Sequence, residues 1–394
     1  MTEQAYIIAA KRTPVGKAPR GVFRLTRPDD LLAHVLRGVV DDCGGLSGQT
    51  IDDVIIGCAM PEAEQGLNIA RITALLAGLP VNVPGVTVNR FCASGLQSIA
   101  MAADRIRLGE ADIMIAGGVE SMSMVPMMGN KIAMNPAIFD NENVAIAYGM
   151  GVTAENVAER WKVSREAQDS FALESHQRAL AATAAGHFAS ETLPYEVQQH
   201  LPAADGTVQI SKRWVEHDEG PRQDTSLQAL SKLRPVFNAK GSVTAGNSSQ
   251  MSDGAAAVVL VSERKLKELK LQPLARFLGY SVAGVPPEIM GIGPKEAIPK
   301  LLKQTGIKLD DIDWIELNEA FAAQALAVIN DLQLNPEKVN PLGGAIALGH
   351  PLGATGSIRT ATVVHGLQRT QARYGMVTMC IGTGMGAAGL FERC

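Results

Sequence analysis

The feature that most constrains the fold is a pattern that recurs, in the same order, in two distant parts of the chain. The separation is 261 residues for the first matched pair (312 − 51) and 258 for the second (350 − 92). A near-constant separation over ordered matches predicts an internal duplication of one βαβ-type unit rather than chance patterning. The matched stretches are residues 51–57 and 312–318, residues 91–95 and 349–353, and residues 111–118 and 374–382.

Within the copies, strand-like runs alternate with helix-like runs, which is typical of α/β layers. A helix is expected at residues 29–40, and a second at 96–106 with Gly109 just past its end. The chain has 394 residues, enough for two or more domains around a large core. The predicted strands are residues 5–10, 54–57 and 86–88, together with 112–118, a strand that enters a turn at Gly117 and Gly118.

The middle of the chain departs from this pattern and is interpreted as an insertion packed over the duplicated body. It opens with a methionine-rich stretch, 121–128, and contains one clear helix, 164–185, with Ser164 as its expected N-cap. Insertions of this length often form lids or binding walls. Methionines usually fill cores, but their adaptable side chains also suit an acyl pocket. The predicted domains are residues 1–120 with 250–271, the insertion 121–249, and residues 272–394.

Composition excludes several classes of function. The formal net charge is −4, so no broad basic surface argues for a nucleic-acid partner, although a small anionic ligand needs only a few local cations. The five cysteines show no metal-ligand spacing, which predicts no metal site and a reducing compartment. We expect a cytoplasmic location, because no signal core, membrane-length apolar run or peroxisomal ending is evident.

Four segments are predicted to end a strand and to enter a glycine-rich or helical turn: residues 89–95, 317–321, 343–356 and 380–389. In α/β folds, sites assemble at the carboxyl ends of such strands. The polar residues of these segments are Cys92, Asn318, His350 and Cys380.

Cys92 is predicted to lie at a helix N-terminus, where the positive end of the dipole lowers the pKa of a thiol. The small residues 93–95 leave space beside its sulfur, although most lone cysteines are inert and buried. His350 is flanked by glycines, Pro351 suits a first helical position, and an imidazole pKa of ~6.5 suits proton exchange. A structural histidine is the alternative. The other six histidines (34, 176, 187, 200, 217 and 365) are expected at the surface.

Cys380 precedes glycines at 382, 384, 386 and 389, whose backbone N–H groups are free to point at an anion. Residues 384–389 match a dinucleotide fingerprint formally, but too few residues follow for the helix and second strand, so an oxyanion-binding loop is preferred. Asn318 is interpreted either as a helix cap or as a residue that positions a water or a carbonyl. Two thiols and one imidazole fit a two-step carbon chemistry, whereas a hydrolase needs one thiol.

With these segments in place, nearly the whole chain resembles the thiolase family. That resemblance implies a duplicated five-layer αβαβα body of α/β class, with a loop domain inserted in its first half. The matching stretches are NRFCASGLQS, GGVESMS, TAENVAER, KLRPVF, VTAGNSSQMSDGAAA, GVPPEIMGIGP, LNEAFAAQ, NPLGGAIALGHPLGATG and MCIGTGMGAA.

The resemblance implies a role for each site residue. Cys92 is expected to accept the acyl group, and His350 to take its proton and help bind the keto oxygen. Asn318 is expected to hold the water of that oxyanion site. Cys380 is the implied acid/base at the acetyl-CoA enolate, and the Cys92 and Gly382 N–H groups form the second oxyanion hole.

Coenzyme A and acetyl-CoA are implied as substrates, with no permanently bound cofactor. The implied CoA contacts are Arg222 near the nucleotide, Ser249 near the pantetheine, and the walls Met150, Ala320 and Phe321. Biosynthetic members carry His-Met-Gly where this chain has Gly-Met-Gly at 149–151, which leaves a roomier and less polar pocket. Thiolytic cleavage of 3-ketoacyl-CoA in fatty-acid β-oxidation is therefore favoured.

Several alternatives stay open at this stage. One is a biosynthetic acetoacetyl-CoA thiolase, and another is a 3-oxoadipyl-CoA thiolase of ring degradation. Cys380 argues against a decarboxylating ketosynthase, and the intact Cys92, His350 and Cys380 argue against a non-catalytic acyl-CoA-binding protein. The resemblance also implies a homodimer or homotetramer, and allows association with a hydratase/dehydrogenase subunit.

Overall fold

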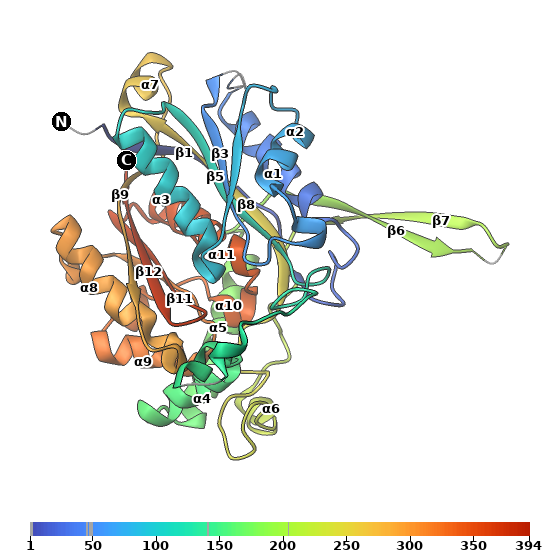
Figure 1. Cartoon of the computed structure of the whole chain (residues 1–394), viewed down its shortest axis with the longest axis vertical. Helices are drawn as coiled ribbons and strands as arrows, with labels where there is room; N and C mark the ends of the chain where they lie inside the picture. The colour runs from blue at the N-terminus through green and yellow to red at the C-terminus, as the bar shows by residue number, and fades with distance from the viewer. Residues whose placement is uncertain (1–2, 45, 47–49, 140–141, 204) are drawn as a thin grey trace.

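Figure 1 shows a computed structural model of the chain, which describes residues 3–44, 46, 50–139, 142–203 and 205–394. Most of the strands in this part of the chain form one mixed sheet. Along that sheet the order is β10 (Trp314–Leu317), β11 (Tyr374–Ile381), β12 (Met385–Arg393), β9 (Ala275–Gly284), β1 (Ala5–Arg12), β8 (Ser252–Ser262), β5 (Ile113–Ser121), β3 (Asp53–Gly57) and β4 (Gly85–Val88).

Apart from the edge strand β4, which has no counterpart beside β10, the two halves of this strand order have the same topology, as the duplication predicts. From the central β1–β9 pair outward, one half runs β1, β8, β5, β3 and the other runs β9, β12, β11, β10. In each half the innermost neighbours pair antiparallel, and the outer pairs, β3 with β5 and β10 with β11, are parallel. Parallel neighbours require crossover connections, which place helices on the faces of the sheet.

In the described part of the chain these helices build a five-layer αβαβα body (Figure 1). Helices α3 (Ser94–Arg107) and α11 (Leu352–Thr370) pack against each other between the two halves of the sheet. Helix α1 (Pro28–Asp42), with α2 (Ile69–Leu76), covers one outer face, and α8 (Gly293–Thr305), with α9 (Ala322–Leu332), lies on the other side. Nearly all of α11 is buried, which explains its small and apolar residues.

The same hydrogen-bond arrangement occurs at the start of one strand in each copy, and it shows which residues of the two copies are equivalent. The carboxylate of Asp52 accepts bonds from the backbone N–H groups of Asp112 (2.7 Å) and Ile113 (2.9 Å). In the second copy Asp313 accepts from the N–H groups of Arg373 (2.8 Å) and Tyr374 (3.0 Å). The aspartates are separated by 261 residues (313 − 52), and so are the strands that they begin (374 − 113).

The crossing of α3 and α11 keeps the same separation and corrects one predicted equivalence. A Cβ on Gly95 would lie 2.8 Å from the Ser357 nitrogen, and a Cβ on Gly356 would lie 2.3 Å from the Leu96 nitrogen. Each glycine therefore lets the other helix approach closely at equivalent positions, 261 residues apart (356 − 95). His350 consequently corresponds to residue 89 (350 − 261), not to Cys92.

The predicted turn at Gly117 and Gly118 is wrong, because β5 continues through both residues to Ser121. A Cβ on Gly117 would lie 2.3 Å from the carbonyl oxygen of Ala256 on β8. A Cβ on Gly118 would lie 2.2 Å from the carbonyl oxygen of Gly353 at the start of α11. These glycines serve close backbone packing inside a strand rather than chain reversal.

Gly118→Ala should lower the free energy of unfolding by about 2–3 kcal/mol, because the clashing atom belongs to the backbone and cannot rotate away. The matched control is Gly254→Ala on the neighbouring strand, where the new Cβ would meet nothing nearer than 3.5 Å, an ordinary contact. Urea unfolding at constant slope measures both variants. Equal midpoints for the two proteins would contradict this packing role.

The expected helix 164–185 is present as α5 (Arg165–Ala184), and the Ser164 hydroxyl caps it by accepting from the Ala167 N–H. It belongs to the insertion between β5 and β8, which also contains α4 (Met150–Arg160), α6 (Leu227–Ser231) and the hairpin β6 (Tyr195–Pro202) and β7 (Val208–Val215). Buried Arg12 of β1 ties this insertion to the body through ion pairs with Glu191 (2.6 Å) and Asp218 (2.7 Å).

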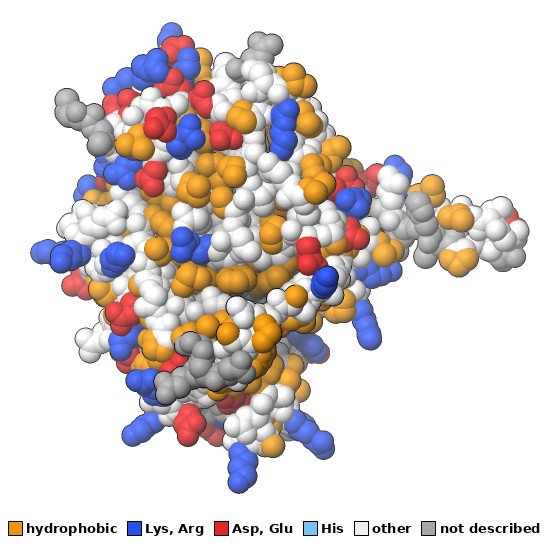
Figure 2. All heavy atoms as spheres, in the orientation of Figure 1, with side chains coloured by type: hydrophobic (Ala, Val, Ile, Leu, Met, Phe, Trp, Pro, Cys, Tyr) orange, Lys and Arg blue, Asp and Glu red, His pale blue; other side chains and the backbone are white. Residues whose placement is uncertain are grey.

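The β6–β7 hairpin projects well beyond the rest of the molecule (Figures 1 and 2). Three apolar side chains of its second strand, Val208, Ile210 and Trp214, are exposed. A two-stranded hairpin has little core of its own.

Among the described residues, no helix is both long and apolar enough to cross a membrane.

Candidate active site

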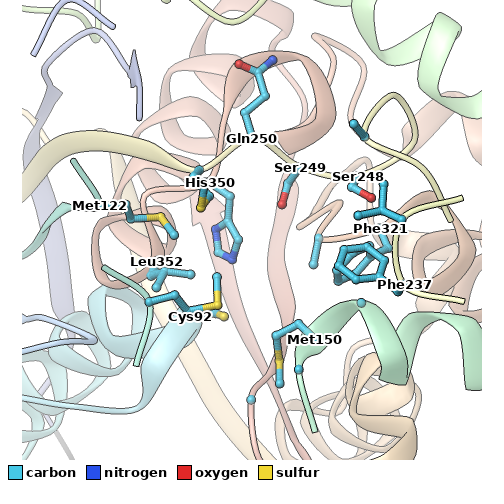
Figure 3. Close-up of a pocket in the computed structure, with 18 of the residues that line it drawn as sticks. Cys92, Met122, Met150, Phe237, Ser248, Ser249, Gln250, Phe321, His350 and Leu352 are labelled. Carbon is cyan, nitrogen blue, oxygen red and sulfur yellow. The ribbon is translucent and has the colours of Figure 1, made fainter. Parts of the chain in front are cut away.

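A large, mostly apolar cavity of about 1130 Å³ opens between the duplicated body and the insertion. Figure 3 shows the His350 ring pointing toward the sulfur of Cys92, with Met150 and Phe321 on the other side of the cavity. Asn318 does not line the cavity but contacts Nε2 of His350 at 3.3 Å. The predicted site residues that line it are Cys92, His350, Cys380, Gly382, Arg222, Ser249, Met150, Ala320 and Phe321.

Cys92 lies in a tight 3₁₀ turn, Phe91–Ala93, between β4 and α3. Phe91 adopts a φ of 45°, a left-handed conformation that a bulky residue rarely takes. Local bonds hold it there, because Asn89 Oδ1 accepts from the Phe91 N–H (2.8 Å) and the Ser94 hydroxyl donates to the Phe91 carbonyl (2.7 Å). The strained turn presents the Cys92 side chain to the cavity.

The electrostatics of Cys92 differ from the sequence prediction. Burial raises the pKa of its thiol to about 11, and this effect exceeds the opposing one of the Gly382 and Cys92 backbone N–H groups. The expected lowering of the pKa by the helix N-terminus is therefore wrong for the free site. Cys92 rests as a thiol and has to lose its proton during the reaction.

His350 follows a short helix, α10 (Ala345–Leu348), and not a strand as predicted. Its backbone N–H donates to the Gln250 carbonyl and to the Ser252 hydroxyl, both at 3.1 Å. These bonds join it to the start of β8. Pro351 is the N-cap of α11 rather than its first residue.

Both ring nitrogens of His350 have side-chain partners. Nδ1 lies 2.6 Å from the Thr355 hydroxyl oxygen, and Nε2 lies 3.3 Å from Asn318 Nδ2. Burial, followed by the positive charge of Arg359, lowers the pKa of His350 to about 3, so the ordinary value assumed from sequence does not apply. The imidazole is neutral and able to accept a proton.

Asn318 lies between β10 and α9, but it does not cap the helix. Helix α9 begins at Ala322 with Phe321 as its N-cap, so that alternative is wrong. Asn318 Oδ1 is buried and has no hydrogen-bond partner in the described chain. A polar side chain that is directed at His350 and left partly unsatisfied is suited to a substrate or a water.

Cys380 lies next to the end of β11, and the turn that follows begins at Gly382. Burial, together with the nearby Cys92, raises the pKa of its thiol. The glycines at 386 and 389 were predicted in the anion-binding loop, but both lie inside β12. A Cβ on Gly386 would meet the backbone of Gly293, and a Cβ on Gly389 would meet the side chain of Leu96. Of the four glycines, only Gly382 lines the cavity.

The CoA-contact candidates occupy the wider part of the cavity. Arg222 pairs with Asp224 at 2.9 Å, and both side chains are exposed. The Arg222 backbone N–H donates to Nδ1 of His176 (3.2 Å), which is buried and not at the surface as expected. Of the other histidines, His217 is exposed, positions 34, 187 and 365 are partly buried, and the side chain at 200 lies outside the described residues.

Sequence reasoning missed the buried carboxylate of Glu120. It accepts bonds from the backbone N–H groups of Ala59 (2.8 Å), Met60 (3.2 Å) and Gly353 (2.9 Å), and from the Gln65 amide. It thereby joins the end of β5 to the loop after β3 and to the start of α11. The available signal was an acidic residue at the end of an otherwise apolar strand.

Several methionines line the cavity, among them Met122, Met127 and Met128 of the 121–128 stretch, which agrees with the adaptable-pocket interpretation. Phe237 and Leu352 also line it, although sequence reasoning did not select them. The lining methionines are Met60, Met122, Met127, Met128, Met134, Met150, Met251 and Met290.

Among the described residues, no group of His, Cys, Asp or Glu is arranged to hold a metal ion.

Two family models match the chain almost end to end. Residues 5–264 match the thiolase N-terminal domain, and residues 271–393 match the thiolase C-terminal domain. The chain belongs to the thiolase family.

Among related thiolases, the 3-ketoacyl-CoA thiolase of Bacillus subtilis is 53% identical, with 100% of both chains covered. The peroxisomal 3-ketoacyl-CoA thiolase B of mouse is 47% identical over 98% of this chain and 90% of that protein. Two solved structures are similar, each with a TM-score of 0.89 and 39% identity over 100% of this chain and 99% of the other. They are the acetyl-CoA acetyltransferase of Bacillus anthracis and the human mitochondrial 3-ketoacyl-CoA thiolase. The thiolase fold expected from sequence is thus confirmed.

Proposed function

We propose that this thiolase is an acyltransferase that cleaves 3-ketoacyl-CoA with coenzyme A, giving acetyl-CoA and an acyl-CoA two carbons shorter. The observation that carries the proposal is that two thiols and one imidazole, from Cys92, Cys380 and His350, meet in one large apolar cavity. The relatives at 53% and 47% identity bear the 3-ketoacyl-CoA thiolase name, which favours this reaction over the biosynthetic condensation.

In the first step, the Cys92 sulfur attacks the 3-keto carbon while its proton moves to Nε2 of His350. The bond between C2 and C3 then breaks, its electron pair forms the acetyl-CoA enolate, and the acyl group stays on Cys92 as a thioester. The Cys380 thiol protonates C2 of the enolate and becomes a thiolate. Because burial keeps Cys380 protonated, it begins this step as an acid.

In the second step, Cys380 takes the proton of the coenzyme A thiol, whose sulfur attacks the Cys92 thioester. The acyl group leaves on coenzyme A, and the Cys92 sulfur recovers a proton from His350. We assign stabilisation of the negative charge on the keto oxygen to His350 and Asn318. Stabilisation of the charge on the thioester oxygen is assigned to the backbone N–H groups of Cys92 and Gly382. The Gly382 N–H favours the thiolate form of Cys92, lowering its pKa against the larger effect of burial, which supports this assignment.

Coenzyme A and acyl-CoA act here as substrates, with no permanently bound cofactor. We assign the exposed Arg222 to phosphate, Ser249 to the pantetheine, and Met150, Ala320 and Phe321 to the reactive end, and their common place in the lining of the cavity supports this. The edge-on contact of Phe237 with Phe321, at 6.1 Å between ring centres, stiffens that wall.

The acyl chain length should separate the degradative function from the biosynthetic one. We expect kcat/KM for C8–C16 3-ketoacyl-CoAs to equal or exceed that for the C4 substrate, since each buried methylene adds about 0.8 kcal/mol of transfer free energy. Steady-state thiolysis over this series measures it, with 3-oxoadipyl-CoA as an additional arm. Cleavage of the C4 substrate alone would contradict the proposal.

The predicted division into residues 1–120 with 250–271, 121–249 and 272–394, the homodimer or homotetramer and the cytoplasmic location are further proposals. The exposed hairpin residues support self-association, because they leave apolar surface uncovered. The five free cysteines support a reducing compartment. Association with a hydratase/dehydrogenase subunit stays a prediction.

A further inference from the structure

Thr355 stands out among the threonines of α11. The Thr362 hydroxyl lies 2.9 Å from the Glu191 carboxylate and 3.3 Å from the Ile358 carbonyl. The hydroxyls of Thr360 and Thr370 each donate to the carbonyl four residues earlier, both at 2.8 Å. This is the usual bond of a threonine inside a helix. The Thr355 hydroxyl instead lies 2.6 Å from Nδ1 of His350, and in the described chain the ring is its one hydrogen-bond partner.

The surroundings favour this contact. Thr355 is only 1% exposed and His350 is 5% exposed, so bulk water has little access to the bond between them. Threonine in a helix divides between two χ1 rotamers, and the one seen here directs the hydroxyl at the ring rather than at a backbone carbonyl. Thr355 lies one turn into α11, whose start is held by the Glu120 carboxylate through the Gly353 N–H.

With Nδ1 in the short contact with Thr355, Nε2, whose contact with Asn318 is longer, is the ring nitrogen available for the reaction. Asn318 Nδ2, an amide donor, lies 3.3 Å from Nε2, which fits a lone pair there. In a neutral imidazole a lone pair on Nε2 requires the proton on Nδ1, and in that tautomer the Thr355 oxygen accepts a hydrogen bond from Nδ1–H. In the proposed first step it is this Nε2 lone pair that receives the Cys92 proton.

We propose that Thr355 is a positioning residue that, by accepting from Nδ1–H, fixes the ring orientation and tautomer in which His350 Nε2 faces Cys92. The inference rests on the proposed function for its catalytic consequence but not for its geometry. A neutral hydroxyl here takes the position that a carboxylate holds beside the histidine of hydrolytic triads. Because the hydroxyl adds no negative charge, it orients the ring while raising its basicity less than a carboxylate would.

The test compares two isosteric threonine-to-valine variants in α11, one at Thr355 and one at Thr360, together with a serine variant that restores the hydroxyl. Thr355→Val removes the hydroxyl at Nδ1, and we expect kcat for thiolysis to fall about ten- to hundredfold while KM for coenzyme A changes less than about twofold. Thr355→Ser restores the hydroxyl and should recover kcat to within about threefold. Thr360→Val, which removes a hydroxyl bonded to the Gly356 carbonyl, is the matched control and should leave kcat unchanged.

A double-mutant cycle separates positioning from general stability. In a His350→Ala background, adding Thr355→Val should slow the enzyme no further, because the partner is already gone. Alkylation of Cys92 by iodoacetamide supplies a readout that needs no substrate, and it should slow in Thr355→Val but not in Thr360→Val. If no 3-ketoacyl-CoA is cleaved, the proposed function fails while this readout still tests Thr355. Unchanged kcat and alkylation in Thr355→Val, or no rescue by serine, overturns the inference.

Discussion

Replacing Cys92 with serine should lower thiolysis by about 10⁴-fold or more, because the hydroxyl is a far weaker nucleophile and cannot form the thioester intermediate. The exchange removes almost no volume, so the free energy of unfolding should stay nearly unchanged. CoA-dependent loss of 3-ketoacyl-CoA measures the rate. Mass spectrometry of protein quenched during turnover should find the acyl group on the peptide containing Cys92 in the unchanged protein alone.

The matched control for this prediction is Cys43→Ser, since Cys43 is a free, partly buried cysteine outside the cavity. It should retain full activity and the acylated Cys92 peptide. Substantial thiolysis by the Cys92→Ser protein would remove Cys92 from the role of acyl acceptor and would leave the mechanism without its first step.

Cys380→Ala should separate the two halves of the reaction. The variant should still accept an acyl group from an acyl-CoA donor onto Cys92, because the coenzyme A thiolate can leave without the proton that Cys380 supplies, whereas a carbon acid cannot exchange its proton without a base. It should lose the exchange of C2 protons of acetyl-CoA with deuterium oxide by about 10²–10⁴-fold, the usual contribution of a positioned acid or base. NMR of the recovered acetyl-CoA measures the deuterium at C2.

The rate of thiolysis by the Cys380→Ala protein should fall together with its rate of C2 deuterium exchange, because the same thiol protonates the departing enolate. The control for this variant is Cys58→Ala, which removes another fully buried thiol that lies outside the lining of the cavity. Normal deuterium exchange in the Cys380→Ala protein would show that another group moves the proton and would refute the role given to Cys380.

The buried site explains why neither thiol is reactive by itself. Burial raises the pKa of both cysteines and lowers that of His350, so the free site holds two thiols and a neutral imidazole. Creating a thiolate and an imidazolium in advance would place separated charges in an apolar cavity. Proton transfer to His350 therefore has to accompany the attack of the sulfur, when charge moves on to the keto oxygen.

Much of the fold could be predicted because it depends on local pattern. The alternation of strand and helix runs, the Ser164 cap and the repeat of the βαβ unit are all present. Gly117 and Gly118 were assigned wrongly because glycine permits both turns and close packing. Only the neighbouring backbone, here at Ala256 and Gly353, distinguishes the two uses.

The sequence by itself determined which elements form and which chemical groups the chain holds, because periodicity, caps and motifs are read along the backbone. Only the tertiary structure decided which groups meet: it brought His350 from the second copy to Cys92 of the first and placed Thr355 at the ring. It also decided their protonation, since burial depends on all the segments that enclose the cavity. Contact and solvent exclusion are properties of the packed chain, and no local pattern encodes them.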